Sequence, residues 1–327
     1  MQQGVLVRIG INVPFRDSRR ELLDGAGVAA RAQMIEAAGL DGIWIGDHIS
    51  PTRPDPLLWL LTAANATEHV EIGTAIYIVP LRRPHDLAQR FVTLQALAPG
   101  RFTLGVGTGS LMSEFEMAGV SFDDRFRLLH AEMELIRAIC EGKPPETELS
   151  EGARSQTFLG VRNVGGALRS APWGQIVGRP RFVLGAWHSE RQLRRAVADY
   201  DGWMCSAGRT TYRTMTDAIS RYRELGGRRA LIATCSVDLR ATTTPLGPDD
   251  PFHLECQPED ARERLQRVAD LGFDDILLAK TDTEHRFGGG FEHDFTMEDL
   301  EEIRSLLPRD ERSISGPGMP SASGGHL

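Results

Sequence analysis

The chain has 327 residues, a formal net charge of −8 at pH 7 and a hydrophobic content of 41%. This length and apolar content suit one large α/β barrel or two average domains. The acidic balance excludes nucleic acid or an anionic membrane surface as the main partner, because both require a basic face.

The cysteines indicate a reducing compartment. Cys140, Cys205, Cys235 and Cys256 are far apart and form no CxxC pair, which is not the pattern of a disulfide framework. There is no run of about 18 apolar residues, and residues 1–8 lack the apolar segment of a signal peptide. We therefore expect a cytoplasmic protein without a membrane span.

Short apolar runs alternate with helical patterns through most of the chain. This strict alternation predicts a parallel (β/α)8 TIM barrel with right-handed crossovers, and the alternative is an open doubly wound sheet. The predicted strands are residues 7–13, 42–46, 70–79, 102–106, 181–184, 202–205, 229–237 and 275–279. The predicted helices are residues 25–38, 56–67, 85–97, 126–141, 190–200, 212–225, 258–271 and 297–307.

Two segments interrupt this alternation. Residues 142–180 are rich in Gly and Pro and lie between the fourth helix and the fifth strand, so we expect a lid-like insertion there. Residues 241–256 form a second, shorter insertion. Residues 309–327 are rich in Ser, Gly and Pro, which predicts a disordered tail after a single domain at residues 1–308.

The end of the second predicted strand carries the first candidate site residues. In a TIM barrel the site forms at the carboxyl ends of the strands, and Asp47-His48 follows the second strand. An imidazole titrates near neutral pH, so His48 is a candidate for proton transfer, with a structural histidine as the alternative. We expect Asp47 to orient its neighbours or cap a turn rather than act as an acid.

A glycine-rich loop, residues 105–110, follows the fourth strand. It does not match the dinucleotide motif GxGxxG, because Ser110 stands at the third glycine position and the loop is not in the first βα unit. Glycines still allow a flat ligand to approach the backbone closely. Gly107, Thr108, Gly109 and Ser110 are therefore candidate ligand contacts.

The fifth strand is followed by Gly185, Ala186, Trp187, His188 and Ser189. Ser189 stands at the N-cap position of the next helix, whose free N–H groups can bind an anion such as a phosphate. An ordinary capped helix is the alternative interpretation.

Other chemistries have weaker support. There is no HExxH pair, and His285 and His293 lie in a glycine-rich stretch that is typical of a solvated loop, so we expect no metal site. No GxSxG motif of a hydrolase is present. Lys280 follows the eighth strand and leaves a lyase with an imine intermediate as a minor alternative.

Taken together, segments 42–48, 72–84 and 99–107 resemble the bacterial luciferase-like superfamily of flavin and deazaflavin oxidoreductases. The likeness runs in order from about residue 7 to 307. It continues in Glu114-Phe115, Gly119, Arg125-Phe126, Phe158-Leu159-Gly160 and Asp201-Gly202-Trp203.

The resemblance implies a TIM barrel that binds reduced FMN or the deazaflavin coenzyme F420 at its carboxyl end. His48 matches the active-site histidine of the family. Ala75 and Ile76, which Tyr77 follows, match a position where family members have a non-proline cis peptide. In those members the cis peptide lies behind the ring system of the cofactor. Residues 107–110 match the loop beneath the cofactor, residues 185–189 match the phosphate site, and residues 142–180 match an insertion that covers the pocket.

Departures from the family pattern narrow the expected activity. The F420-dependent sugar-phosphate dehydrogenases carry a glutamate after the position of Gly109, where this chain has Ser110, so that reaction is disfavoured. The His-His pair of luciferases is absent, because Ile49 follows His48.

We predict a monooxygenase that uses O2 and reduced FMN, supplied by a partner reductase, on a small, apolar organic substrate. One alternative is hydride transfer with coenzyme F420 and no oxygen. The other is a non-catalytic flavin-binding subunit, against which His48 and the intact glycine loop argue. By analogy with relatives, a homodimer is the expected assembly.

Overall fold

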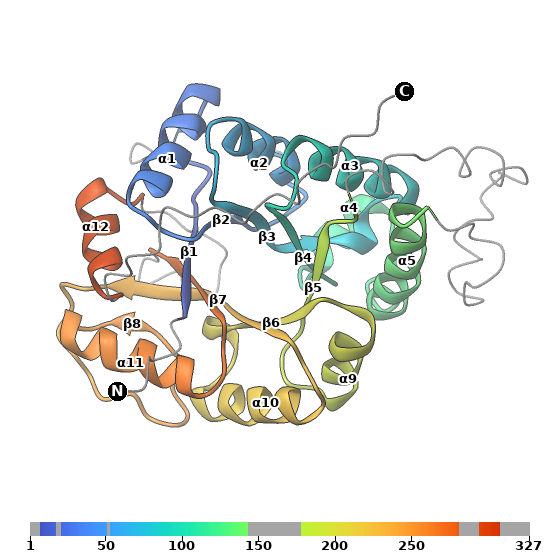
Figure 1. Ribbon diagram of the computed structural model, residues 1–327. Helices are drawn as coiled ribbons and strands as arrows, with labels where there is room; N and C mark the ends of the chain where they lie inside the picture. Colours follow the sequence, from blue (N-terminus) through green and yellow to red (C-terminus); the bar gives the residue numbers. More distant parts are fainter. Residues whose placement is uncertain (1–6, 18–20, 51–52, 143–177, 281–293, 308–327) are drawn as a thin grey trace, which may run out of the picture.

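The computed structural model describes residues 7–17, 21–50, 53–142, 178–280 and 294–307. Within these ranges parallel strands close into a ring, and helices surround it (Figure 1). The predicted TIM barrel is confirmed.

The ring is closed by pairing between β6 and β7, while β1 pairs with both β2 and β9. A short additional strand, β8, pairs with the end of β7 outside the ring. The described strands are β1 (Arg8–Asn12), β2 (Gly42–Ile45), β3 (Glu71–Ile78), β4 (Phe102–Gly107), β5 (Arg181–Gly185), β6 (Gly202–Ser206), β7 (Arg229–Asp238), β8 (Leu254–Glu255) and β9 (Asp275–Ala279).

Several helices begin at clear capping residues. The Asp24 carboxylate accepts the N–H of Gly27 at the start of α1, and Thr296 and Asp299 form a capping box at the start of α12. The described helices are α1 (Gly25–Ala37), α2 (Pro56–Asn65), α3 (Pro84–Leu97), α4 (Met112–Ala118), α5 (Arg125–Cys140), α9 (Glu190–Asp199), α10 (Tyr212–Glu224), α11 (Pro258–Asp270) and α12 (Met297–Ser305), with 3-10 turns η1 (Val79–Leu81) and η2 (Ala207–Arg209).

The predicted insertions are only partly within the described residues. Most of segment 142–180 and the whole of 309–327 lie outside them. Segment 241–256 is described, and it contains β8 and a bridge between Pro251 and Thr211. This second insertion therefore packs against the barrel through backbone pairing.

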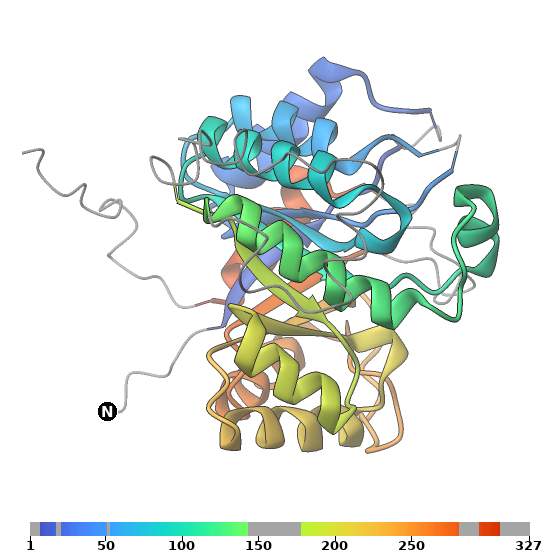
Figure 2. The same cartoon turned by 90° about the vertical axis from the view of Figure 1, so that its right-hand side faces the viewer.

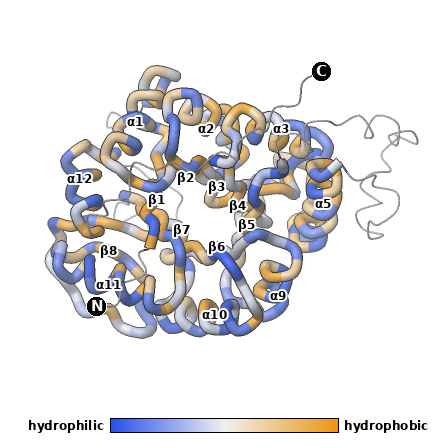
Figure 3. Tube along the Cα trace, in the orientation of Figure 1, coloured by the Kyte–Doolittle hydropathy of each residue, from blue (hydrophilic) through white to orange (hydrophobic). Residues whose placement is uncertain are grey.

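Apolar strand residues form two packed regions. The larger one lies between the strands and the helices, whose outer sides are hydrophilic (Figure 3). The smaller one contains Trp44, Val183, Met204, Leu231 and Leu277.

Glycines make room for the indole of Trp44. A Cβ added at Gly10, Gly42 or Gly73 would lie 2.4–2.7 Å from the Trp44 ring. Such distances are sterically forbidden, so one large aromatic ring takes the space that three side chains would otherwise need.

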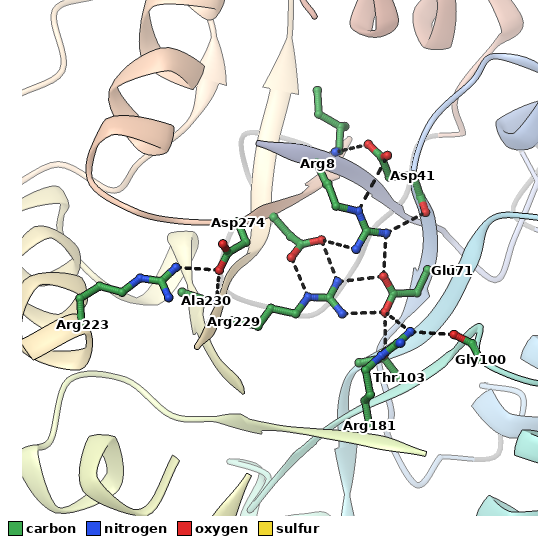
Figure 4. A network of polar contacts seen from close by, with 12 residues as sticks. Arg8, Asp41, Glu71, Gly100, Thr103, Arg181, Arg223, Arg229, Ala230 and Asp274 are labelled. Carbon is green, nitrogen blue, oxygen red and sulfur yellow. Dashed lines mark hydrogen bonds and ion pairs between the residues drawn. The ribbon is translucent and has the colours of Figure 1, made fainter. Parts of the chain in front are cut away.

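At the amino end of the barrel, charged side chains form a continuous network (Figure 4). Glu71 is paired with Arg8 at 2.8 Å, with Arg229 at 2.7 Å and with Arg181 at 3.2 Å. Arg229 also pairs with Asp275 at 2.7 Å. Burial alone would raise the pKa of Glu71, but the bonds and charge of Arg229, with Arg8, lower that pKa to about 2.

Candidate functional site

Several half-buried residues lie at the carboxyl end of the barrel. In β3 the other six residues are buried, but Ala75 and Ile76 are half-buried. The neighbouring strand-end residues Gly46 and Gly185 are half-buried as well. Solvent therefore reaches this end of the barrel along β2, β3 and β5.

Ile76 lies across the ends of β4 and β5. A Cβ added at Gly107 would be 2.8 Å from Ile76 Cδ1, and one added at Gly185 would be 2.5 Å from Ile76 Cγ2. Both glycines are therefore required for the position of this side chain. The peptide bond between Ala75 and Ile76 is cis, as the resemblance implied.

Tyr77 does not join these residues. Its ring is buried, packs edge-on against Phe91 of α3 at 5.8 Å, and lies 4.3 Å from the Arg82 guanidinium. The register between β3 and β4 shifts between Thr74 and Tyr77. Because of this shift, Tyr77 does not continue the inward face of the strand, and its side chain faces the helices.

His48 is paired with a carboxylate that lies 66 residues further along the chain. Its Nδ1 is 2.9 Å from Oε1 of Glu114, which lies in the first turn of α4. The Glu114 side chain is 4% exposed, whereas that of His48 is 26% exposed. In Figure 2 the green helix α4 projects beyond one end of the barrel.

Asp47 lies beside His48 but in a different environment. Its carboxylate is fully buried, forms a bidentate pair with Arg82 at 2.5 and 2.9 Å, and accepts the N–H of Ile78 at 2.9 Å. Burial opposes the charge of Arg82, but the bonds to Asp47 raise the pKa of this guanidinium above its ordinary value. This is the geometry of a group that orients the ends of β2 and β3.

The glycine-rich loop after β4 lies at the same end of the barrel. Thr108 and Gly109 are half-buried and Ser110 is exposed. Gly109 has φ +76°, and a Cβ there would lie 2.8 Å from Ile78. The loop therefore needs glycine at this position both for its backbone conformation and for its packing.

The segment after β5 offers backbone groups at the start of α9. The Ala186 carbonyl accepts the Trp203 Nε1 proton at 2.8 Å, which fixes the segment to β6. Trp187, His188 and Ser189 are exposed, and the Ser189 side chain makes no capping hydrogen bond. The Gln192 N–H in the first turn of α9 donates to the Ser189 carbonyl at 2.8 Å, and the Ser189 side chain caps none of the first-turn N–H groups.

Two weaker candidates gain no support. Lys280 Nζ is 2.5 Å from Asp299 Oδ2, so this lysine is held in an ion pair. Among the described residues no group of three or more side chains is arranged to hold a metal ion. His285 and His293 lie outside the described residues.

None of the helices in the described ranges is long and apolar enough to cross a membrane.

The family model described as luciferase-like monooxygenase matches residues 7–238. The chain belongs to this family. The matched region contains every strand end discussed above from β2 to β6.

Curated relatives match over shorter segments. The F420-dependent glucose-6-phosphate dehydrogenase of Kineococcus radiotolerans is 40% identical over 139 residues, which is 39% of this chain and 41% of the relative. The 4-hydroxyprotoasukamycin monooxygenase of Streptomyces nodosus subsp. asukaensis is 32% identical over 123 residues, 37% of this chain and 33% of the relative. The matches thus span less than half the length of these two relatives.

Solved structures share the fold over nearly the whole chain. The monooxygenase RslO1 from Streptomyces bottropensis has a TM-score of 0.70 at 15% identity and covers 92% of this chain and 97% of its own. The coenzyme F420-dependent tetrahydromethanopterin reductase from Methanopyrus kandleri has a TM-score of 0.64 at 16% identity, covering 92% and 98%. At these identities the likeness shows the fold alone.

Proposed function

We propose that the chain is a flavin-dependent monooxygenase that binds reduced FMN at the carboxyl end of its barrel and uses O2 to oxygenate a small organic substrate. One observation carries the proposal. The half-buried Ala75–Ile76 surface, which needs Gly107 and Gly185, lies at the same end of the barrel as the His48–Glu114 pair. A partner reductase would supply the reduced cofactor.

The residues present fit such a cofactor. Ile76, with glycines beside it, offers an apolar surface on which a planar ring can rest without a side chain in the way. The uncapped start of α9 offers N–H groups to a phosphate. The Glu190 carboxylate in that first turn is paired with Arg221 and Arg194, which reduces its repulsion of an anion.

The chain's own groups then have separate tasks. When bound, reduced FMN supplies the electrons that activate oxygen. His48 holds or transfers a proton at Nε2, the ring nitrogen that Glu114 leaves free. Asp47 and Arg82 keep the ends of β2 and β3 in position, so that His48 and Ile76 stay in a fixed relation.

Hydride transfer with coenzyme F420 is a second candidate. It is favoured by the relatives, since those of Kineococcus radiotolerans and Beutenbergia cavernae, the latter 39% identical over 186 residues, are both F420-dependent dehydrogenases. Ser110, which stands in place of the glutamate of the sugar-phosphate enzymes, counts against their particular reaction in this chain.

A parallel anaerobic titration with reduced FMN and reduced F420, followed by admission of oxygen, distinguishes these candidates. Tight binding of reduced FMN with an oxygen-dependent absorbance transient supports the monooxygenase. Preferential binding of F420 with no such transient overturns it in favour of hydride transfer. Binding of flavin with no turnover under any reductant would identify a non-catalytic subunit.

Two glycine variants test whether the bound ring uses the Ile76 surface. Gly185→Ala introduces a Cβ against Ile76 and should weaken reduced-cofactor binding at least tenfold. Gly25→Ala is the matched control, because a Cβ there meets no atom within 4 Å. Equal affinities for both variants in the same titration would place the cofactor elsewhere.

A further inference from the structure

His48 and Glu114 form a hydrogen-bonded pair whose two members differ in exposure. Nδ1 of His48 points at Oε1 of Glu114, at 2.9 Å, and the carboxylate is almost completely buried. The ring is more exposed than its partner. The carboxylate is therefore on the inner side of the pair.

The chemistry of the pair fixes where the proton lies. An ionised carboxylate only accepts hydrogen bonds, so the nitrogen facing it must carry a proton. In the neutral ring this leaves the lone pair on Nε2. The nitrogen that Glu114 does not occupy is then an acceptor.

Glu114 is held for this contact by the short helix around it. Phe115, the next residue, is buried with Ile78 and Leu81, and α4 ends at Gly119 with φ +67°. These contacts fix the backbone at the first turn of α4. The helix thus places the carboxylate at the end of β2 although the two residues are far apart in sequence.

Within the described ranges Glu114 has no bidentate arginine partner of the kind that Asp47 has in Arg82. Asp47 uses both oxygens on Arg82, whereas the second oxygen of Glu114, Oε2, is buried without a hydrogen-bond partner in the described part of the chain. Arg53 adds a favourable charge interaction with Glu114. The hydrogen bond of this carboxylate is directed to His48.

We infer that Glu114 is a positioning residue that keeps His48 in the Nδ1-protonated form and presents Nε2 to the bound reactants. The inference rests on the proposed function and adds the protonation state to it. When Nε2 accepts a proton from a reactant, the net charge of the pair changes from −1 to 0, and the donor becomes more negative by one unit. Buried Glu114 stabilises the imidazolium that forms.

The test is a long-range proton–nitrogen NMR spectrum of the cofactor-free protein carrying 15N-histidine. Loss of one signal set in His48→Gln assigns His48. At a pH where the ring is neutral, the wild type should show a protonated Nδ1 and an unprotonated Nε2. The opposite pattern in the wild type overturns the inference, and this spectrum requires no variant of Glu114 to fold.

Variants of two glutamates on α4 extend the test. In Glu114→Leu no acceptor faces Nδ1, so Nδ1 should lose its preference for the proton, which should then lie mainly on Nε2. The control Glu116→Gln changes an exposed carboxylate on the same helix and should leave the pattern unchanged. A His48 that stays protonated at Nδ1 in folded Glu114→Leu overturns the role of Glu114.

Turnover separates this inference from the proposed function. With whichever cofactor supports activity, Glu114→Gln should lower kcat by about 10- to 100-fold at an unchanged cofactor Kd. An unchanged kcat overturns the inference. Absence of binding and turnover in the wild type refutes the proposed function alone, because the NMR result does not depend on a cofactor.

Discussion

The amino and carboxyl ends of this barrel are built from opposite kinds of side chain. At the amino end, long arginines reach inward and pair with Glu71 and Asp275 (Figure 4). At the carboxyl end, Gly107 and Gly185 leave room for the side chain of Ile76. One end is closed by ion pairs, and the other is left open to solvent along the ends of the strands.

The two ends also differ in how completely their polar groups are satisfied. Both oxygens of Glu71 are bonded, to Arg229 and to further partners. At the other end, the amide of Asn12 and the second oxygen of Glu114 are buried without a hydrogen bond to any described residue. The amino end therefore contributes stability, whereas the carboxyl end keeps unpaired groups that function can use.

Among the variants that test this comparison, Arg229→Met should lower the unfolding free energy most. It removes the most buried arginine from Glu71 and Asp275, which keep the more exposed Arg8. Removing one partner of a buried pair costs up to about 3–5 kcal/mol. Arg221→Met is the control, because its pairs with Glu190 and Glu224 lie on the surface, where solvent and salt screen them. Urea unfolding of both variants measures the difference, and equal losses would contradict a stabilising role for the amino end.

Acid should weaken the amino end through Glu71. Its pKa is lowered from 4.5 to about 2, so the stability that it contributes is complete above about pH 4.5 and is lost as the pH falls toward 2. The lowering corresponds to about 3 kcal/mol. The unfolding free energy of Glu71→Gln, followed from about pH 6 to pH 2, should fall less steeply than that of the wild type. Parallel curves would show that Glu71 is not the titrating group.

His48→Ala tests the carboxyl end. Loss of the imidazole should reduce turnover at least tenfold while the affinity for the reduced cofactor stays the same, because the ring moves protons and does not form the apolar surface. His69→Ala is the matched control, since its side chain is 80% exposed. Full activity of His48→Ala in product-formation assays would remove His48 from the mechanism.

Asn12→Leu should have the smallest effect, and it should raise the unfolding free energy rather than lower it. Asn12 is 1% exposed and its amide has no described hydrogen-bond partner, so an apolar side chain of similar shape should raise the unfolding free energy by about 1 kcal/mol. Asn65→Leu, at an exposed position on α2, should change it little. Thermal unfolding compares them, and a marked destabilisation in Asn12→Leu would show that the amide is satisfied.

The sequence predicted the strands and helices that have a clear hydrophobic period or a clear helix cap. The predicted strand 42–46 corresponds to β2, and the predicted helix 258–271 corresponds to α11, which Pro258 and two acidic residues begin. These signals are local, because apolar alternation and capping act over a few residues. The barrel followed from their order along the chain.

The contacts within the candidate site could not be predicted in the same way. Helix α4 has only seven residues, too few for a clear helical period, so the pairing of Glu114 with His48 was not foreseen. The partner of Asp47, Arg82, lies 35 residues away. Tyr77 was placed with the cofactor contacts because it follows Ala75 and Ile76 at the end of the third strand. The register shift in β3 instead accompanies a Tyr77 ring that packs against Phe91 and Arg82.

Hydrogen–deuterium exchange with and without saturating reduced FMN or F420 locates the cofactor site. We expect new protection confined to the carboxyl ends of the strands, in peptides covering residues 46–50, 75–81, 107–112 and 185–190. Peptides at the amino end, around Glu71 and Arg229, should exchange as before. Protection at the amino end, or none at the strand ends, would contradict the assignment of the open end as the cofactor site.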